Sequence, residues 1–145
     1  MPLDQEDLIA IALAVALRRK KRRVKWTRDW LLKRHEMSHT NLLAELKLEP
    51  DDWRNYLRMD EGTYIDLLNR VTPLITYEDT SMRKAETPHE RLSVTLRYLA
   101  TGRSLNDMKY SAIISTSALS SIIPETCDAL YRVLQNEYLK VRNTL

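Results

Sequence analysis

The chain has 145 residues and a formal net charge of +3, with 43% hydrophobic and 30% charged residues. This length is enough for one domain with a core of its own, and the composition excludes the disordered and membrane-embedded classes of protein. With two glycines and many Leu, Ala, Glu, Lys and Arg residues, the chain favours helices over hairpins, so we expect an all-α, multi-helix fold. The single cysteine, Cys127, can form neither an internal disulfide nor a zinc cluster, which fits a reducing compartment.

Residues 1–40 form the first predicted unit, which is an N-terminal helix with a basic end. The helix is expected to begin near Asp4, and its apolar run from Leu8 to Leu17 is shorter than the ~20 residues that span a bilayer. Its acidic start, with the cations after the apolar run, differs from a secretion signal. We therefore expect an intracellular protein with no membrane partner.

The positive charge of the chain is concentrated in residues 18–34. This segment holds ten Lys or Arg and one Asp, a local charge of +9, while the rest of the chain sums to −6. Such a run can bind phosphates or act as a nuclear import signal, and it can also be a solvated helix end. Because six adjacent cations exceed what helix capping needs, we predict a nucleic-acid contact and a nuclear location, with the cytoplasm as the alternative. We interpret Trp26 and Trp30, four residues apart, as core anchors rather than base-stacking platforms. The predicted phosphate-binding residues are Arg18, Arg19, Lys20, Lys21, Arg22, Arg23 and Lys25.

One short motif has the spacing of a zinc site. Residues 35–39 read H-E-x-x-H, which on a continuous helix places His35 and His39 on one face, with Glu61 as a candidate third ligand. Ser38 has the character of a helix cap and would break the helix between the two histidines. We therefore expect no metal and two exposed histidines, and no other cofactor motif is present in the sequence.

Residues 41–145 form the second predicted unit, which begins with three helices. The expected helices cover 39–47, 51–58 and 61–75, and their start signals are Ser38, Glu49-Pro50 and Asp60. Pro73 is expected to end or kink the third helix. The polar stretch 77–86 lacks periodicity and is predicted to be a long loop or a subdomain boundary.

The strongest helix start lies at Thr87-Pro88-His89-Glu90, which has the composition of a capping box. The helix that follows should place Leu92, Leu96 and Leu99 on one face and end at Gly102 in a left-handed cap.

Two further helices are predicted after Gly102. A short helix should run from Ser104 to about Tyr110, and a long one should start at Ser115-Thr116-Ser117, with a kink or restart at Pro124. Its predicted apolar positions are Leu119, Ile122, Ile123, Leu130, Val133 and Leu134.

This spacing over about 87–138 is that of a helix-turn-helix, although ordinary bundle packing can give the same pattern. The predicted nucleic-acid contacts are the hydroxyls of Ser115, Thr116, Ser117 and Ser120, with no Arg, Asn or Gln beside them for base readout.

From Asn41 onward the sequence resembles a known family. The relevant stretches are NLLAELKLEPDDWRNYLRM at 41–59, the segment 79–130 with ERLSVTLRYLATG and ISTSALSSIIPE, and EYLK at 137–140. They resemble the N-terminal region of Harbinger-type transposases and of the nuclease-like host proteins derived from them. The resemblance implies helix-turn-helix DNA binding, self-association as a homo-oligomer, nuclear location and contact with a Myb/SANT-like partner.

Members of that family continue into a catalytic domain that holds divalent metal with an Asp-Asp-Glu set. The resemblance ends near VRNTL, before any position that could match those carboxylates. No nucleophile and base are paired in the sequence either, so we expect no catalysis from this chain as it stands, with divalent metal expected only in the family's catalytic domain.

The sequence leaves three functions open. The first is a DNA-associated helix-turn-helix module of a truncated or domesticated Harbinger-type transposase. The second is a helical protein-interaction module that pairs with a transposase or a Myb/SANT-like partner without binding DNA. The third is an enzyme, either a nuclease completed in trans or a zinc hydrolase that uses His35 and His39.

Overall fold

The computed structural model describes residues 5, 7, 9, 28–81 and 83–138, and the described part of the chain is all-α. The helices are, in chain order, α2 (Asp29–Leu32), α3 (Arg34–Met37), α4 (His39–Leu46), α5 (Pro50–Leu57), α6 (Glu61–Ile75), α7 (Pro88–Thr101), α8 (Leu105–Ala112) and α9 (Thr116–Leu134). Extended backbone pairs only at an isolated antiparallel bridge between Thr80 and Arg83 within these residues. The predicted fold class is therefore confirmed.

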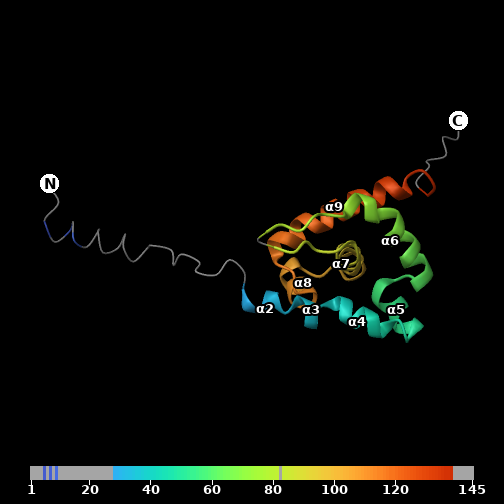
Figure 1. The fold of residues 1–145 in the computed structure, drawn as a ribbon, viewed down its shortest axis with the longest axis horizontal. Coiled ribbons are helices and arrows are strands. Elements are labelled where there is room, and N and C mark those ends of the chain that lie inside the picture. Colours follow the sequence, from blue (N-terminus) through green and yellow to red (C-terminus); the bar gives the residue numbers. More distant parts are fainter. Residues whose placement is uncertain (1–4, 6, 8, 10–27, 82, 139–145) are drawn as a thin grey trace.

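Helix α7 is the centre of the fold. Figure 1 shows it nearly end-on, with α9, α6, α5, α4 and α8 arranged around it, and it contacts all five. Seven consecutive residues of α7, from Glu90 to Leu96, are buried. A surface helix buries only one stripe along its length, so burial around the whole circumference means that the other helices enclose α7.

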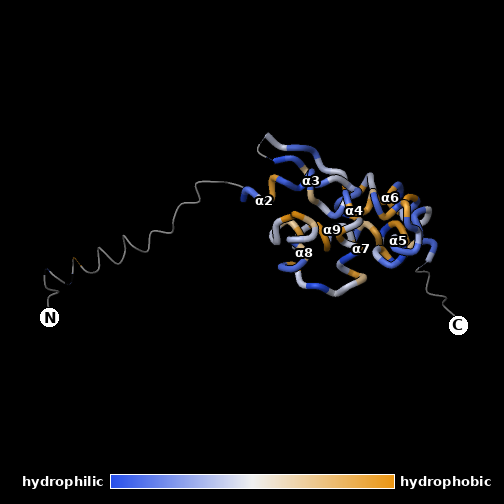
Figure 2. The backbone as a smooth tube through the Cα atoms, turned by 90° about the horizontal axis from the view of Figure 1, so that it is seen from below, coloured by the Kyte–Doolittle hydropathy of each residue, from blue (hydrophilic) through white to orange (hydrophobic). Residues whose placement is uncertain are grey.

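Two groups of buried apolar side chains pack on different sides of α7. The first group joins α4, α5, α6, α7 and α9, and the second joins α7 to α8 and α9. Figure 2 shows hydrophobic positions gathered where these helices meet and a mainly hydrophilic loop outside them. The first group consists of Leu43, Trp53, Leu57, Tyr64, Leu67, Val71, Ile75, Leu92, Leu96 and Ala129. The second consists of Val94, Met108, Ala112, Ile114, Leu119, Ile122 and Ile123.

Most helix starts follow the predicted side-chain caps. Thr87 Oγ1 accepts a hydrogen bond from the Glu90 amide at 3.2 Å, and Glu90 Oε2 accepts one from the Thr87 amide at 2.7 Å, which is the predicted capping box. Ser104 and Ser115 accept in the same way at the starts of α8 and α9. Gly102 ends α7 with a φ of 63°, a left-handed conformation that glycine adopts without steric cost.

Several details can be compared with the predictions. Helix α6 has the predicted bounds and continues through Pro73, and α9 continues through Pro124 without restarting. Helix α8 extends two residues past Tyr110, to Ala112. Leu99 is 58% exposed instead of sharing the buried face of Leu92, because the chain beyond Leu96 emerges from the ring of surrounding helices.

The segment 77–86 is a loop, as predicted, but it does not separate two subdomains. Tyr77 Oη donates a hydrogen bond to Glu125 Oε2 on α9 at 3.1 Å, and the Ala85 amide donates to Asp79 Oδ1 at 2.7 Å. The helices before and after the loop, α6 and α7, contribute to the same core group, so the loop connects two parts of one packed unit.

Candidate nucleic-acid interface

The basic run assigned to phosphate binding lies outside the described residues, since these include nothing from 10 to 27. The same holds for most of the predicted N-terminal helix, of which only Gln5, Asp7 and Ile9 are described, all three in helical conformation. The contribution of the basic run therefore stays a prediction from sequence.

The predicted hydroxyl contacts lie together at the start of α9. Ser117 and Ser120 are exposed, while Ser115 and Thr116 are half-buried. Ser115 Oγ accepts from the Ala118 amide at 3.3 Å, so this oxygen is already used as the helix cap. Ser120 Oγ donates to the Ser117 carbonyl at 2.7 Å and keeps its lone pairs. The first turn of a helix presents amides and a partial positive charge, an arrangement that suits a phosphate oxygen.

Asn106 is a neighbour of this helix start that the sequence analysis missed. It is exposed on α8, and its Oδ1 accepts a hydrogen bond from Thr116 Oγ1 at 3.5 Å. An amide side chain can both donate a hydrogen bond to an adenine edge and accept one from it. Asn106 therefore supplies the base-reading type of side chain that is missing from the residues next to Ser115 in sequence. Ten residues separate Asn106 from Thr116 in the sequence, and only the packing of α8 on α9 brings them together.

The turn that joins α8 to α9 consists of residues 113–115 and holds a strained residue. Ile113 has φ 55° and ψ 40°, the left-handed region, which is unfavourable for a β-branched side chain. The turn lets Ile114 insert fully into the second core group, while Ser115 starts the next helix. The burial of Ile114 thus sets the direction of α9 relative to α8.

Trp30 is not a core anchor, contrary to the prediction. It is half-buried, belongs to neither core group, and stacks on Tyr110 of α8 with ring centroids 5.6 Å apart and planes inclined by 31°. Tyr110 itself is 62% exposed. Lys109 Nζ lies 4.7 Å from the centroid of the Tyr110 ring, so a cation borders this aromatic pair. The second predicted anchor, Trp26, lies outside the described residues.

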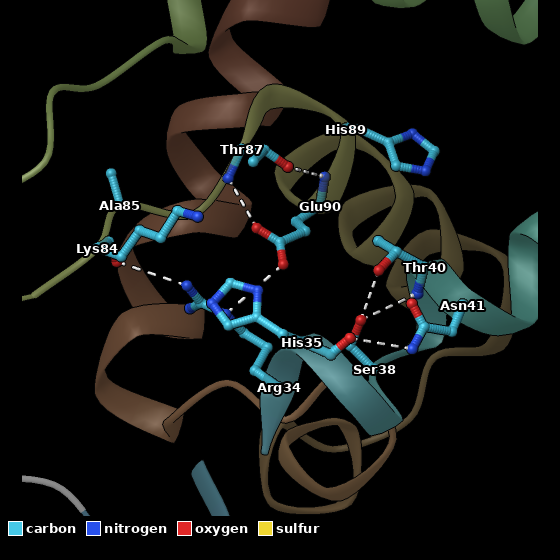
Figure 3. A pocket seen from close by; sticks show the side chains of 10 residues that line it. All are labelled: Arg34, His35, Ser38, Thr40, Asn41, Lys84, Ala85, Thr87, His89 and Glu90. Atoms are coloured by element: carbon cyan, nitrogen blue, oxygen red, sulfur yellow. Dashed lines mark hydrogen bonds and ion pairs between the residues drawn. The ribbon is translucent and has the colours of Figure 1, made fainter. Parts of the chain in front are cut away.

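Arg34, which the sequence analysis counted with the basic run, is buried and paired. Its Nη1 donates to Glu86 Oε1 at 2.9 Å, and its Nε lies 3.5 Å from Glu90 Oε1. Figure 3 shows this guanidinium in a polar pocket between α3, α4 and the start of α7. With two carboxylates beside it, Arg34 links the N-terminal helices to α7 and is not available to a phosphate.

The two histidines of the H-E-x-x-H motif lie on different helices. Ser38 ends α3 and caps α4, with its Oγ accepting from the Thr40 amide at 3.3 Å, as predicted. His35 is exposed, as predicted, but His39 is 5% exposed, because the new helix turns it into the interior. His39 Nε2 lies 2.6 Å from Ser93 Oγ of α7. Within the described part of the chain, no group of three or more His, Cys, Asp or Glu is arranged to hold a metal ion.

The His39–Ser93 contact has the atoms of a base and a nucleophile, but its surroundings are those of a core. Ser93 is completely buried, and its Oγ also donates to the His89 carbonyl at 2.6 Å. Burial, with a smaller contribution from the nearby His89, lowers the pKa of His39 to about 4. A substrate cannot reach a hydroxyl at this depth, so the contact fastens α4 to α7.

Within the residues that the structure describes, no helix is long and apolar enough to cross a membrane. No protein-family model, no curated protein and no solved structure matches this chain.

Proposed function

We propose that this chain is a DNA-associated helix-turn-helix module of a truncated or domesticated Harbinger-type transposase. The observation that carries the proposal is the α8–α9 pair, which is joined by a three-residue turn and packed beside α7, with the hydroxyls of α9 exposed at its start. In this proposal the first turn of α9 lies in the major groove. Ser117 and Ser120 contact phosphate, and Asn106 reaches a base edge.

The negative charge of residues 28–138 indicates that another segment supplies the affinity for DNA. Residues 28–138 contain 14 Lys or Arg against 17 Asp or Glu, so by themselves they repel a polyanion. We therefore assign phosphate binding to residues 18–25, which hold seven cations and no acid. Neutralised phosphates release counterions, so the affinity should fall steeply as the salt concentration rises.

The test is binding of the purified full chain to labelled random-sequence duplex DNA across a salt series. A variant with all six residues from Arg18 to Arg23 changed to Ala should flatten the slope of log K against log salt by up to about 5, because each duplex phosphate contact contributes about 0.9. A matched variant with Lys at all six positions keeps the charge and should keep the slope. Absence of binding by the wild-type chain at low salt would contradict the proposal.

A second experiment separates the contacts that α9 makes with DNA from the electrostatic attraction of the basic run. The double variant Ser117→Ala, Ser120→Ala removes two exposed hydroxyls and no charge, so it should weaken duplex binding while leaving the salt slope unchanged. Leu99→Ala, a change at an exposed position of α7, is the control for a general effect on the surface. Equal binding by the double variant and the wild type would remove α9 from the interface.

The second candidate is a helical protein-interaction module, and exposed apolar side chains on successive short helices favour it. Leu32 on α2, Met37 on α3 and Leu42 on α4 are all exposed. Such side chains are common in grooves that receive an amphipathic helix. A Myb/SANT-like partner or a second copy of the chain would fit this role, as would pairing with a full-length transposase. Binding of such a partner by a chain that has no affinity for DNA would favour this candidate. Nuclease activity completed in trans is a separate alternative, and it would require bound divalent metal.

A further inference from the structure

The Trp30–Tyr110 pair is an aromatic surface that the core does not use. The two rings come from α2 and α8 and stack with centroids 5.6 Å apart, while Tyr110 remains 62% exposed. Large aromatic side chains gain stability when they are buried, so a ring left this open beside a second ring contributes less to folding than it could. The two rings are therefore placed to receive another flat, apolar surface.

Three cations lie near this pair, one of them in space and two in sequence. Lys109 Nζ lies 4.7 Å from the Tyr110 ring centroid, and Arg28 and Lys33, on either side of Trp30 in sequence, are exposed and form no ion pair with any described residue. Positive charge thus lies beside the stacking surface at Lys109, and close to it in sequence at Arg28 and Lys33.

We propose that Trp30 and Tyr110 form a stacking platform for an unpaired nucleobase, so that the chain binds single-stranded nucleic acid. The free part of the Tyr110 ring takes the base, and Lys109, on its flexible stem, moves from the ring to the adjacent phosphate. In a duplex each base is already stacked between its neighbours, so the platform acts only on unpaired bases. The cations that the platform uses are Lys109, Arg28 and Lys33, so the inference does not use residues 18–25 and stands apart from the proposed function.

The test compares labelled oligo(dT) with a duplex of equal length, both with the full chain. Tyr110→Leu keeps an apolar contact for Trp30 but removes the aromatic face, and Tyr110→Phe keeps the face. One lost stacking contact of about 1–3 kcal/mol corresponds to a loss of about 5- to 150-fold in affinity. We expect this loss for Tyr110→Leu on oligo(dT), near wild-type affinity for Tyr110→Phe, and unchanged duplex binding by both variants.

The salt dependence distinguishes stacking from charge. Tyr110→Leu should leave the salt slope on oligo(dT) unchanged, whereas Lys109→Gln should reduce it by about 0.7, the value for one phosphate of a single strand. Tyr131→Leu, a change at another exposed tyrosine on α9, is the matched control and should bind as the wild type does. Urea unfolding of each variant shows whether the fold is retained.

Two results would overturn the inference: wild-type affinity of Tyr110→Leu for oligo(dT), or equal losses on oligo(dT) and duplex. If instead the proposed duplex binding is wrong, the experiments give a different result. In that case duplex binding is absent or independent of α9, while the Tyr110-dependent preference for oligo(dT) persists.

Discussion

His39 lies in the interior between α4 and α7, where its imidazole has to remain neutral while the protein is folded. Its Nε2 contacts Ser93 Oγ at 2.6 Å, and burial with help from His89 lowers its pKa to about 4. In the unfolded chain the same group has its ordinary pKa of 6.5. Between these two values the unfolded state binds a proton that the folded state does not bind, so acid favours unfolding.

The size of this effect follows from the two pKa values. The contribution of His39 to stability is fully present above pH 6.5, is lost as the pH falls toward 4, and changes little below that. Lowering the pH from 7 to 5 should therefore cost about 2 kcal/mol of the free energy of unfolding through His39 alone. With a urea dependence of about 1–3 kcal/mol per M, the unfolding midpoint should fall by about 1 M.

The assay is urea unfolding of the wild type and of His39→Gln at pH 7 and pH 5. Glutamine can place an amide nitrogen near Ser93 Oγ but does not titrate, so the variant should be less stable at pH 7 and should lose about 2 kcal/mol less between the two pH values. All other titrating groups are common to both proteins, so the difference between the two losses reports on His39 together with its coupling to His89. Equal losses in the two proteins would refute the assignment of this pH dependence to His39.

Three further changes test the packing. Thr87→Ala removes the capping oxygen of α7 and should lower the free energy of unfolding by about 1 kcal/mol, whereas Thr87→Ser should keep most of it; urea unfolding of the two variants decides. Arg34→Met leaves the buried Glu90 carboxylate without its cation, while Glu86 keeps its ion pair with Arg83, and should cost about 3 kcal/mol, against less than about 1 for Lys47→Met in a half-exposed ion pair. Equal costs at these two sites would contradict the role given to burial. Leu119→Ala should cost about 2–5 kcal/mol because the side chain is fully buried, and Leu99→Ala should change stability by less than about 0.5, as thermal unfolding would show.

The helix starts could be predicted from sequence because each depends on a few adjacent residues. Thr87 and Glu90 form a capping box through contacts three residues apart, and Ser38 separates the two histidines through a contact two residues away. Hydroxyl caps act locally, so neither prediction required knowledge of the fold.

The roles of individual side chains were harder to predict, because they depend on contacts between distant residues. Arg34 belongs to a basic run in the sequence, yet its partners are 52 and 56 residues away, at Glu86 and Glu90. His39 looked exposed because its neighbours are polar, but α7 covers it. Trp30 looked like a core residue because of its size, although it stacks on an exposed tyrosine 80 residues later. Pro73 and Pro124 stay inside continuous helices, where packing outweighs the local preference to end.

If this chain binds DNA, the electrostatic attraction to DNA and the positioning of the DNA on the protein must come from different parts of the chain. Residues 28–138 carry more acids than bases, and several of their cations are already engaged, among them Arg34 with Glu90 and Arg91 with Glu125. The start of α9 offers hydroxyls and amides, which position a phosphate but supply little long-range attraction. Changes in residues 18–25 should therefore alter the salt dependence, and changes at Ser117 should alter binding without altering that dependence. If one set of changes affected both quantities equally, a single surface would be responsible and the division of roles would be wrong.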